Sequence, residues 1–342
     1  MKARRIFVIV CIVLLTCAVG GTFFLYWTLS PVDAQDTTAV RIEIPAGSSA
    51  RLIAQKLQAA KLVHSGFVFY LCARFGLIPH DFKAGTYDLS PAHTIRDIAQ
   101  ILSEGRQVYI IVSFPEGLTI SKMAHIAEEK ELCSAQEFIA AAHDSALIAA
   151  HAVPASTLEG YLFPDTYYFT PGMSATDIIE LMLDNFYAKL DELGVSPQMA
   201  PQTVHENIIL ASVVEREYRA AEEAPLIASV FANRLRDGIG LYSCATIEYI
   251  ITEIQGKPHP DVIKYADLEI DNPYNTYKWA GLPAGAISNP GLVALSAVVN
   301  PVQTDYYFFR LTDPQSGTHT FSKTFDAHIA AESLYTKKAA GR

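Results

Sequence analysis

The sequence predicts an α+β protein behind an N-terminal transmembrane helix, and three observations lead to this fold class. A long apolar run without charged residues stands near the N-terminus. Beyond it, short β-type segments alternate with segments whose apolar residues recur every three or four positions, which is typical of helices. Half of the 342 residues are hydrophobic, so the part outside the membrane can build a sizeable core.

The apolar run covers residues 6–29 and is long enough to span a bilayer. Three basic residues lie within positions 1–5, and such a positive flank stays in the cytoplasm. We therefore expect a single-pass cell-membrane protein with a cytoplasmic tail at 1–5 and an extracytoplasmic C-terminal part. The run is longer than the core of a cleaved signal peptide. A lipoprotein signal ending at Cys17 is an alternative, although the apolar run continues past that cysteine.

Charge and cysteine usage exclude several classes of protein. The formal net charge of -10 argues against nucleic-acid binding, which needs a basic face. Two of the five cysteines lie in the apolar run, and the other three cannot all pair, so a disulfide framework is not expected. The ten histidines form no His-Glu-x-x-His motif, and no cysteine pair has zinc-ligand spacing. No metal and no cofactor is expected.

A strand, a turn and a helix recur after a polar linker at residues 30–40. The pattern occurs over 41–60 and again over 109–127, with Pro-x-Gly in the turn and a Ser or Thr that can cap the helix. A variant follows Gly85, in which Thr94 can cap the helix. Such units either bind an extended polymer or support the rest of the chain. Further helices are predicted over 134–152, 175–193, 225–238 and 292–299, and a hairpin over 305–322.

A helix predicted from about residue 205 to 218 carries two glutamates near its end. Glu217 lies three, four and seven residues after Val214, Val213 and Leu210, which places it on the apolar side. Glu215 then points to roughly the opposite side. A carboxyl on a buried side stays protonated near neutral pH and can act as a general acid. The alternative is an ion-paired helix end with a neighbouring arginine as the partner.

Two further segments combine turn residues with aromatic or amide side chains. Residues 158–169 are dense in aromatics, which either line a sugar-binding cleft or pack in the interior. Residues 272–291 contain several Gly and Pro turns around aromatic and amide side chains. That composition suits a loop that binds a polar ligand, or a well-ordered structural loop. His319, in a predicted strand, touches substrate or serves the structure.

Six segments together resemble one family, the membrane-anchored endolytic murein transglycosylases of the MltG (YceG-like) type. They occur in order between about residues 40 and 330, behind the predicted membrane helix. The matching segments are FKAGTY at 82–87, EGYLFPDT at 159–166, ASVVERE at 211–217, ASVFANRL at 228–235, YNTY at 274–277 with GLP at 281–283, and HTF at 319–321.

The resemblance implies a LysM-like module at 41–130 and a mixed α/β catalytic domain at 131–342. It implies that Glu217 is the catalytic acid, the residue that helix periodicity also selects. The implied substrate is peptidoglycan glycan strands, with peptidoglycan synthases as a further partner. Substrate contacts are expected in the matching, aromatic and loop segments: Tyr161, Asn233, Tyr274, Asn275, Thr276, Tyr277, Gly281 and Leu282.

The chain departs from the family pattern at two places. Tyr218 follows Glu217 where the family often has Thr, so the small hydroxyl next to the acid is missing. Tyr242, Cys244 and Ala245 replace Gln, Asp and Pro of some relatives.

The expected reaction is non-hydrolytic cleavage of the β-1,4 bond between N-acetylmuramic acid and N-acetylglucosamine, which leaves a 1,6-anhydro end on nascent strands and ends their elongation. It needs one acid/base carboxyl, whereas glycosidases usually need two. A true muramidase is an alternative, with Asp165 or Glu159 as its second carboxylate. A non-catalytic glycan-binding module and a scaffold for a synthase complex are the others.

Overall fold

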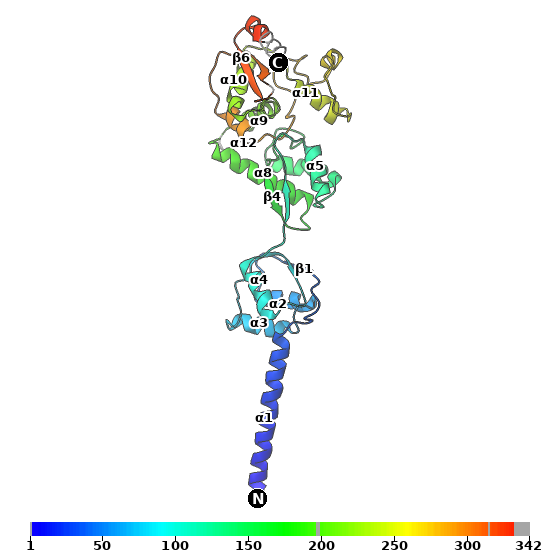
Figure 1. Ribbon diagram of the computed structural model, residues 1–342, viewed down its shortest axis with the longest axis vertical. Coiled ribbons are helices and arrows are strands. Elements are labelled where there is room, and N and C mark those ends of the chain that lie inside the picture. Colours follow the sequence, from blue (N-terminus) through cyan, green and yellow to red (C-terminus); the bar gives the residue numbers. More distant parts are fainter. Residues whose placement is uncertain (1, 196–198, 314, 332–342) are drawn as a thin grey trace. The chain divides into compact units, whose positions relative to one another are not determined.

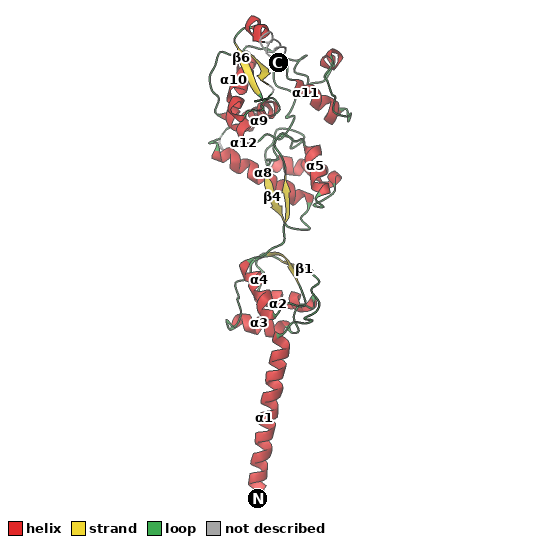
Figure 2. Ribbon diagram, viewed as in Figure 1, coloured by secondary structure: helices red, strands yellow, loops and turns green. Residues whose placement is uncertain are grey.

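The computed structural model describes residues 2–195, 199–313 and 315–331, and it has the mixed α+β fold that the sequence predicts. Two compact units make up the chain, Met1–Ile110 and Ile111–Arg342. Helices and short two-stranded sheets occur in both (Figures 1 and 2).

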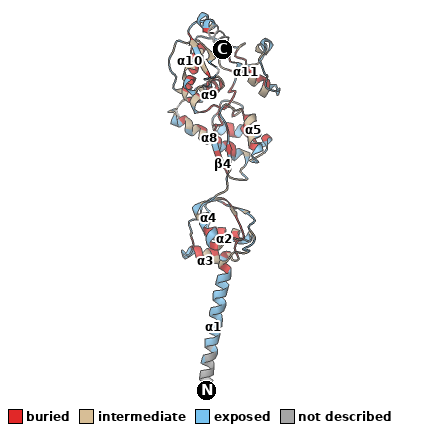
Figure 3. Ribbon diagram, in the orientation of Figure 1, coloured by how far each residue is buried: buried red, intermediate tan, exposed pale blue. Residues whose placement is uncertain are grey.

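Helix α1, Lys2–Leu29, opens the first unit. Within it, Cys11–Leu29 is long and apolar enough to cross a membrane. Its side chains are exposed along most of its length, as Figure 3 shows. A helix that is apolar all round and exposed is consistent with a membrane anchor.

The rest of the first unit is a two-stranded antiparallel sheet with three helices. Ser49, Ser65 and Thr94 cap the helices, each accepting a backbone N–H bond with its side chain. The sequence predicts the caps at Ser49 and Thr94, whereas the helix that Ser65 caps was not predicted. Ile53, Leu57 and Tyr87 are central to its core. The elements are β1 (Val40–Ile44), α2 (Ala50–Ala59), α3 (Gly66–Arg74), β2 (Gly85–Leu89) and α4 (Ile95–Glu104).

The second unit begins with a helical layer around another small sheet. Strand β3 pairs with β4, and α5 packs against α6. The second strand-turn-helix copy, which we grouped with the first in one module ending at 130, therefore lies in the second unit. The elements are β3 (Ile110–Ser113), α5 (Ile120–Glu129), α6 (Ala135–Ala142), α7 (Ser145–Ala150), β4 (Thr166–Phe169) and α8 (Ala175–Glu192).

The remainder of the second unit is built around α9, which packs against α10 and α12. The predicted hairpin forms, with Phe309 opposite Phe321. Turns of 3₁₀ or π type lie at Ala221–Glu223, Ile250–Ile254 and Tyr265–Glu269. The elements are α9 (Pro201–Glu215), α10 (Ala224–Arg236), α11 (Cys244–Tyr249), α12 (Leu292–Val299), β5 (Phe308–Asp313) and β6 (Thr318–Ser322).

Candidate active site

Helix α9 ends earlier than the sequence predicts, and this changes the reason for the position of Glu217. The helix stops at Glu215, and Glu217 lies in the following turn, where its N–H donates to the Val214 carbonyl at 3.0 Å. Every residue from Ile208 to Val214 is buried. The expected single apolar side is therefore wrong, because residues 208–214 of α9 are buried on every side, and the turn after the helix directs Glu217.

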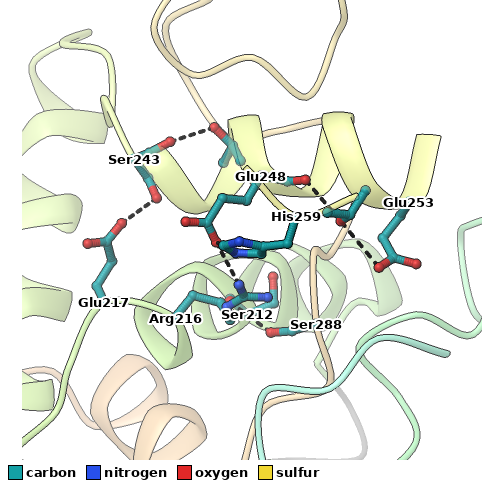
Figure 4. A network of polar contacts seen from close by, with 10 residues as sticks. Ser212, Arg216, Glu217, Ser243, Glu248, Glu253, His259 and Ser288 are labelled. Carbon is teal, nitrogen blue, oxygen red and sulfur yellow. Dashed lines mark hydrogen bonds and ion pairs between the residues drawn. The ribbon is translucent and has the colours of Figure 1, made fainter. Parts of the chain in front are cut away.

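Glu217 is partly buried at the wall of a cavity of about 560 Å³. The Ser243 hydroxyl donates a hydrogen bond to its Oε1, and Figure 4 shows the two side chains pointing toward each other. Aromatic, aliphatic and polar side chains line the cavity. Besides Glu217 they are Phe231, Arg234, Ile239, Leu241, Tyr242, Ser243, Cys244, Phe308, Phe309, Phe325 and His328.

Burial raises the pKa of Glu217 to about 7. The hydrogen bond from Ser243 opposes that shift, the negative charge of Glu248 adds to it, and Arg216 and Arg234 lower the pKa. The carboxyl is therefore substantially protonated near neutral pH and can donate a proton, which an ordinary exposed glutamate cannot do there.

Ser243 is held in place by a buried pair of threonines. Its N–H donates to Thr276 Oγ1 at 3.2 Å, and its carbonyl accepts the Thr246 hydroxyl at 2.8 Å. The two threonine hydroxyls lie 3.0 Å apart. The preceding residue, Tyr242, has a left-handed backbone with φ 51°, which turns the chain so that Ser243 points at Glu217. The hydroxyl beside the acid thus comes from a distant segment.

Arg234 contributes a fixed cation to the same cavity. Its Nε and Nη1 donate to the carbonyls of Tyr307 and Leu241, both at 2.7 Å. Its guanidinium also lies 5.4 Å from the centre of the Phe308 ring and 5.7 Å from that of Tyr242. These contacts keep a positive charge beside Glu217 without a direct ion pair between them.

The expected alternative, a helix end neutralised by an arginine, is not what this turn shows. Arg216 Nη2 instead pairs with Glu248 Oε2 at 2.8 Å, and His259 Nε2 lies 3.5 Å from the same oxygen (Figure 4). The arginine next to Glu217 thus serves another carboxylate, and Glu217 keeps the hydrogen bond from Ser243.

Glu215 points elsewhere, as predicted. It accepts a hydrogen bond from the Gly291 N–H at 2.9 Å and another from the Tyr218 hydroxyl at 3.2 Å. Burial raises its pKa to about 7. Tyr218, which replaces the expected small hydroxyl residue, therefore contacts Glu215 and not Glu217.

Several predicted substrate-binding residues form internal hydrogen bonds. The Tyr161 hydroxyl lies 2.8 Å from His205 Nδ1, and Asn233 donates to the carbonyls of Thr304 and Tyr306. Asn275 donates to two carbonyls in its own loop. These three side chains and that of Thr276 are buried, so in this structure they support the protein itself.

The other predicted contacts are more accessible. Tyr274, Tyr277, Gly281 and Leu282 are partly exposed. The Tyr277 hydroxyl lies 3.0 Å from Cys244 Sγ at the cavity next to Glu217, whereas Tyr274 packs on Tyr249 at 5.1 Å between ring centres. Of the eight predicted residues, Tyr277 and Thr276 thus contact residues that line the same cavity as Glu217, namely Cys244 and Ser243.

Sequence reasoning missed Ser243 and gave no role to Arg234 or to the aromatic wall of the cavity, formed by Phe231, Phe308 and Phe309. The positions of Ser243 and Arg234 beside Glu217 depend on contacts with distant segments. His319, left open between two roles, is a structural residue. Its Nδ1 lies 2.7 Å from Glu223 Oε2, and both side chains are nearly buried.

The two carboxylates considered for a hydrolase, Glu159 and Asp165, accept hydrogen bonds from other residues outside the Glu217 cavity. Glu159 is buried, accepts the Ile120 N–H at 3.1 Å, and is bound by Asn289 at 2.8 Å. Asp165 is exposed and accepts a hydrogen bond from Asn185 at 3.1 Å. Neither lines the cavity next to Glu217.

Glu159 should make the protein less stable as pH rises. Burial raises its folded-state pKa to about 8 from an ordinary value of 4.5. Between these values unfolding releases a proton, so the free energy of unfolding falls as pH rises through this window. Glu159→Gln cannot ionise, so its loss of stability between pH 5 and 8 should be smaller in urea unfolding. Glu206→Gln, at an exposed position, is the control. Equal losses in both variants would contradict the assignment.

Comparison with known proteins now places the chain. The sequence model of the YceG-like family matches residues 42–333. The chain belongs to the YceG-like family. An endolytic murein transglycosylase of Bacillus subtilis (strain 168) is 32% identical to this YceG-like chain, covering 93% of it and 91% of the relative.

Two further relatives extend the comparison. An endolytic murein transglycosylase of Streptococcus pneumoniae (strain D39) is 30% identical over 95% of this chain, which spans 64% of the relative's length. The crystal structure of a putative YceG-like protein from Listeria monocytogenes matches with a TM-score of 0.56 and 31% identity. That match covers 85% of this chain and 98% of the other.

Proposed function

We propose that this YceG-like protein is an endolytic murein transglycosylase and that Glu217 is its catalytic acid. The names of the relatives support the activity. The observation that carries the assignment of Glu217 is its hydrogen bond to a buried serine at the wall of an aromatic cavity, in surroundings that keep it protonated near neutral pH.

One carboxyl suffices for the proposed chemistry. Protonated Glu217 gives its proton to the leaving O4 of N-acetylglucosamine as the C1–O4 bond of N-acetylmuramic acid breaks. The C6 hydroxyl of the same muramoyl residue then attacks C1, the O6–C1 bond forms, and the carboxylate takes the hydroxyl proton. Glu217 returns to its protonated form, and no water is consumed.

The neighbours of Glu217 position its carboxyl group, bind the sugar rings and stabilise the charge that forms during the reaction. Ser243 occupies one carboxyl oxygen, which leaves the other for the proton that moves. The aromatic wall of Phe231, Phe308 and Phe309 offers faces on which sugar rings pack. Arg234 keeps a positive charge in the cavity and stabilises the carboxylate formed after proton donation.

The hydrolase alternative needs a second carboxylate that activates water. Its two expected candidates, Glu159 and Asp165, are bonded outside the Glu217 cavity. This favours the transglycosylase.

We further propose that α1 anchors the protein with its N-terminus in the cytoplasm, so that it cuts nascent strands near the membrane and limits their length. The LysM-like nature of the first unit and a synthase partner follow from the family resemblance and belong to the same proposal.

Mass spectrometry of murein treated with the purified full-length protein tests the proposal. We expect products with 1,6-anhydro ends. Products heavier by one water, with reducing ends, would show a muramidase. Binding to murein without any release would show a glycan-binding module, and either result would overturn the proposed reaction.

A further inference from the structure

The outer side of α3 carries a row of apolar side chains that the first unit leaves exposed. Phe67 and Phe75 are 68% and 72% exposed. Leu71, between them, is partly exposed. Because these positions are four residues apart, they line up along one side of the helix. Leu77, 63% exposed, extends the row beyond the end of the helix.

This row takes no part in the core of its own unit. The opposite side of α3, with Phe69, Cys72 and Ala73, is buried and belongs to the core cluster of the first unit. Stability of the unit therefore does not explain why large apolar residues occupy the outer side. Exposed apolar rows of this kind mark surfaces that bind another apolar phase or partner.

Contacts place the start of α3 beside the end of α1. The ring of Trp27, in the last turn of α1, lies 4.2 Å from that of His64. The same histidine contacts the Pro31 carbonyl with its Nε2 at 3.1 Å. Helix α3 begins two residues later, at Gly66, and its nine residues span only about 14 Å. Figure 1 shows α3 at the end of the first unit that α1 joins.

Basic side chains flank the apolar row. Arg74 is exposed at the last turn of α3. Arg96 donates to the Leu77 carbonyl at 3.4 Å, so its guanidinium lies at the far end of the row. Arg51 lines a cavity of about 300 Å³ together with Phe67. An apolar strip bordered by arginines is typical of helices that lie in the interface of an anionic membrane.

We propose that the outer side of α3 inserts into the outer interface of the membrane that α1 crosses, with the flanking arginines on anionic phospholipid headgroups. This rests on the proposed role of α1 as the anchor. Trp27 is an interfacial residue type at the end of the apolar run, and its contact with His64 makes the surface of α3 continuous with that anchor. The first unit is then fixed on the bilayer by two elements.

Tryptophan quenching by brominated lipid tests this surface in the full-length protein. The chain has two tryptophans, 27 and 279. With both changed to Phe, Phe75→Trp supplies a single reporter in vesicles of phosphatidylglycerol and phosphatidylcholine brominated near the headgroup. We expect quenched, blue-shifted emission, and less quenching without phosphatidylglycerol. Glu43→Trp in the same background, at an exposed position of β1, should not be quenched. Equal emission from both reporters would overturn the proposal.

A second variant separates the surface from the anchor. Trp279→Phe alone leaves Trp27, which brominated lipid quenches only if the end of α1 lies in the bilayer. Quenching of Trp27 without quenching at position 75 overturns the surface and leaves the anchor. A blue shift at position 75 without bromine quenching would show a second copy or a glycan strand on this side, which also overturns it. Murein cleavage, measured on the same samples, reports the proposed activity independently.

Discussion

Replacing Glu217 with glutamine should abolish the release of anhydro-muropeptides from murein and leave the fold intact. Glutamine keeps the size of the side chain and an oxygen that accepts the Ser243 hydroxyl, but it has no acid proton to donate. A positioned general acid contributes about 10²–10⁴-fold to a rate, so cleavage should fall by at least about a hundredfold. Chromatography with mass spectrometry measures the products, and thermal unfolding checks the fold.

Glu215→Gln is the matched control for this experiment. Glu215 is two residues away, and burial raises its pKa to the same value of about 7. It points to the Gly291 N–H, however, and glutamine retains an oxygen to accept that bond. We therefore expect Glu215→Gln to keep most of its activity. Full activity in Glu217→Gln, or equal loss in a stable Glu215→Gln, would refute the assignment.

Local features of the sequence predicted much of the fold. Ser49 and Thr94 were placed at helix starts because their hydroxyls can accept backbone N–H bonds, and both do so. The apolar run at the N-terminus and the C-terminal hairpin over residues 305–322 also follow from short-range patterns. Each of these depends on neighbours within a few residues, which a sequence displays directly.

The pairing of strands that are far apart in the chain could not be predicted from the sequence. Strand β3 has the same local pattern as β1, yet it pairs with β4, whereas β1 pairs with β2. This partner, and not the strand itself, puts the second copy of the motif in the second unit. Nothing within residues 109–127 distinguishes the two cases.

The candidate site shows the same limit. Periodicity selected Glu217 on the assumption that one side of a helix is buried, but residues 208–214 of α9 are buried on every side and the helix ends before Glu217. The direction of Glu217 depends on the turn after α9 and on Ser243, which is 26 residues further along the chain. Thr276 lies 33 residues beyond that. Helix periodicity predicts contacts between residues three or four positions apart and therefore cannot predict contacts over such distances in the sequence.

Removing the hydroxyl of Ser243 should slow the reaction and also move its pH profile. The Ser243 hydroxyl fixes one oxygen of Glu217, and misplacing a catalytic group by about 1 Å can cost about a hundredfold in rate. The kcat of Ser243→Ala should therefore fall by roughly tenfold to a hundredfold at the pH optimum. Because the aromatic wall remains, KM for murein fragments should change little.

The direction of the pH shift distinguishes a positioning role from a merely structural one. The hydrogen bond from Ser243 lowers the pKa of Glu217, so its loss should raise that pKa further. The acid must be protonated to act, so activity falls as pH rises past this pKa, and the falling limb should move to higher pH. The other groups facing Glu217, namely Glu248, Arg216 and Arg234, remain unchanged in the variant.

Ser243→Thr is the rescue variant, because it keeps the hydroxyl and adds a methyl group beside a cavity of about 560 Å³. Its extended backbone, with φ -88° and ψ 122°, suits a β-branched residue. We expect Ser243→Thr to recover the wild-type falling limb and most of kcat. If Ser243→Ala lost activity while the falling limb stayed at the same pH, the serine would only support the loop next to Thr276. The pKa of Glu217 would then be set by burial and the neighbouring charges alone.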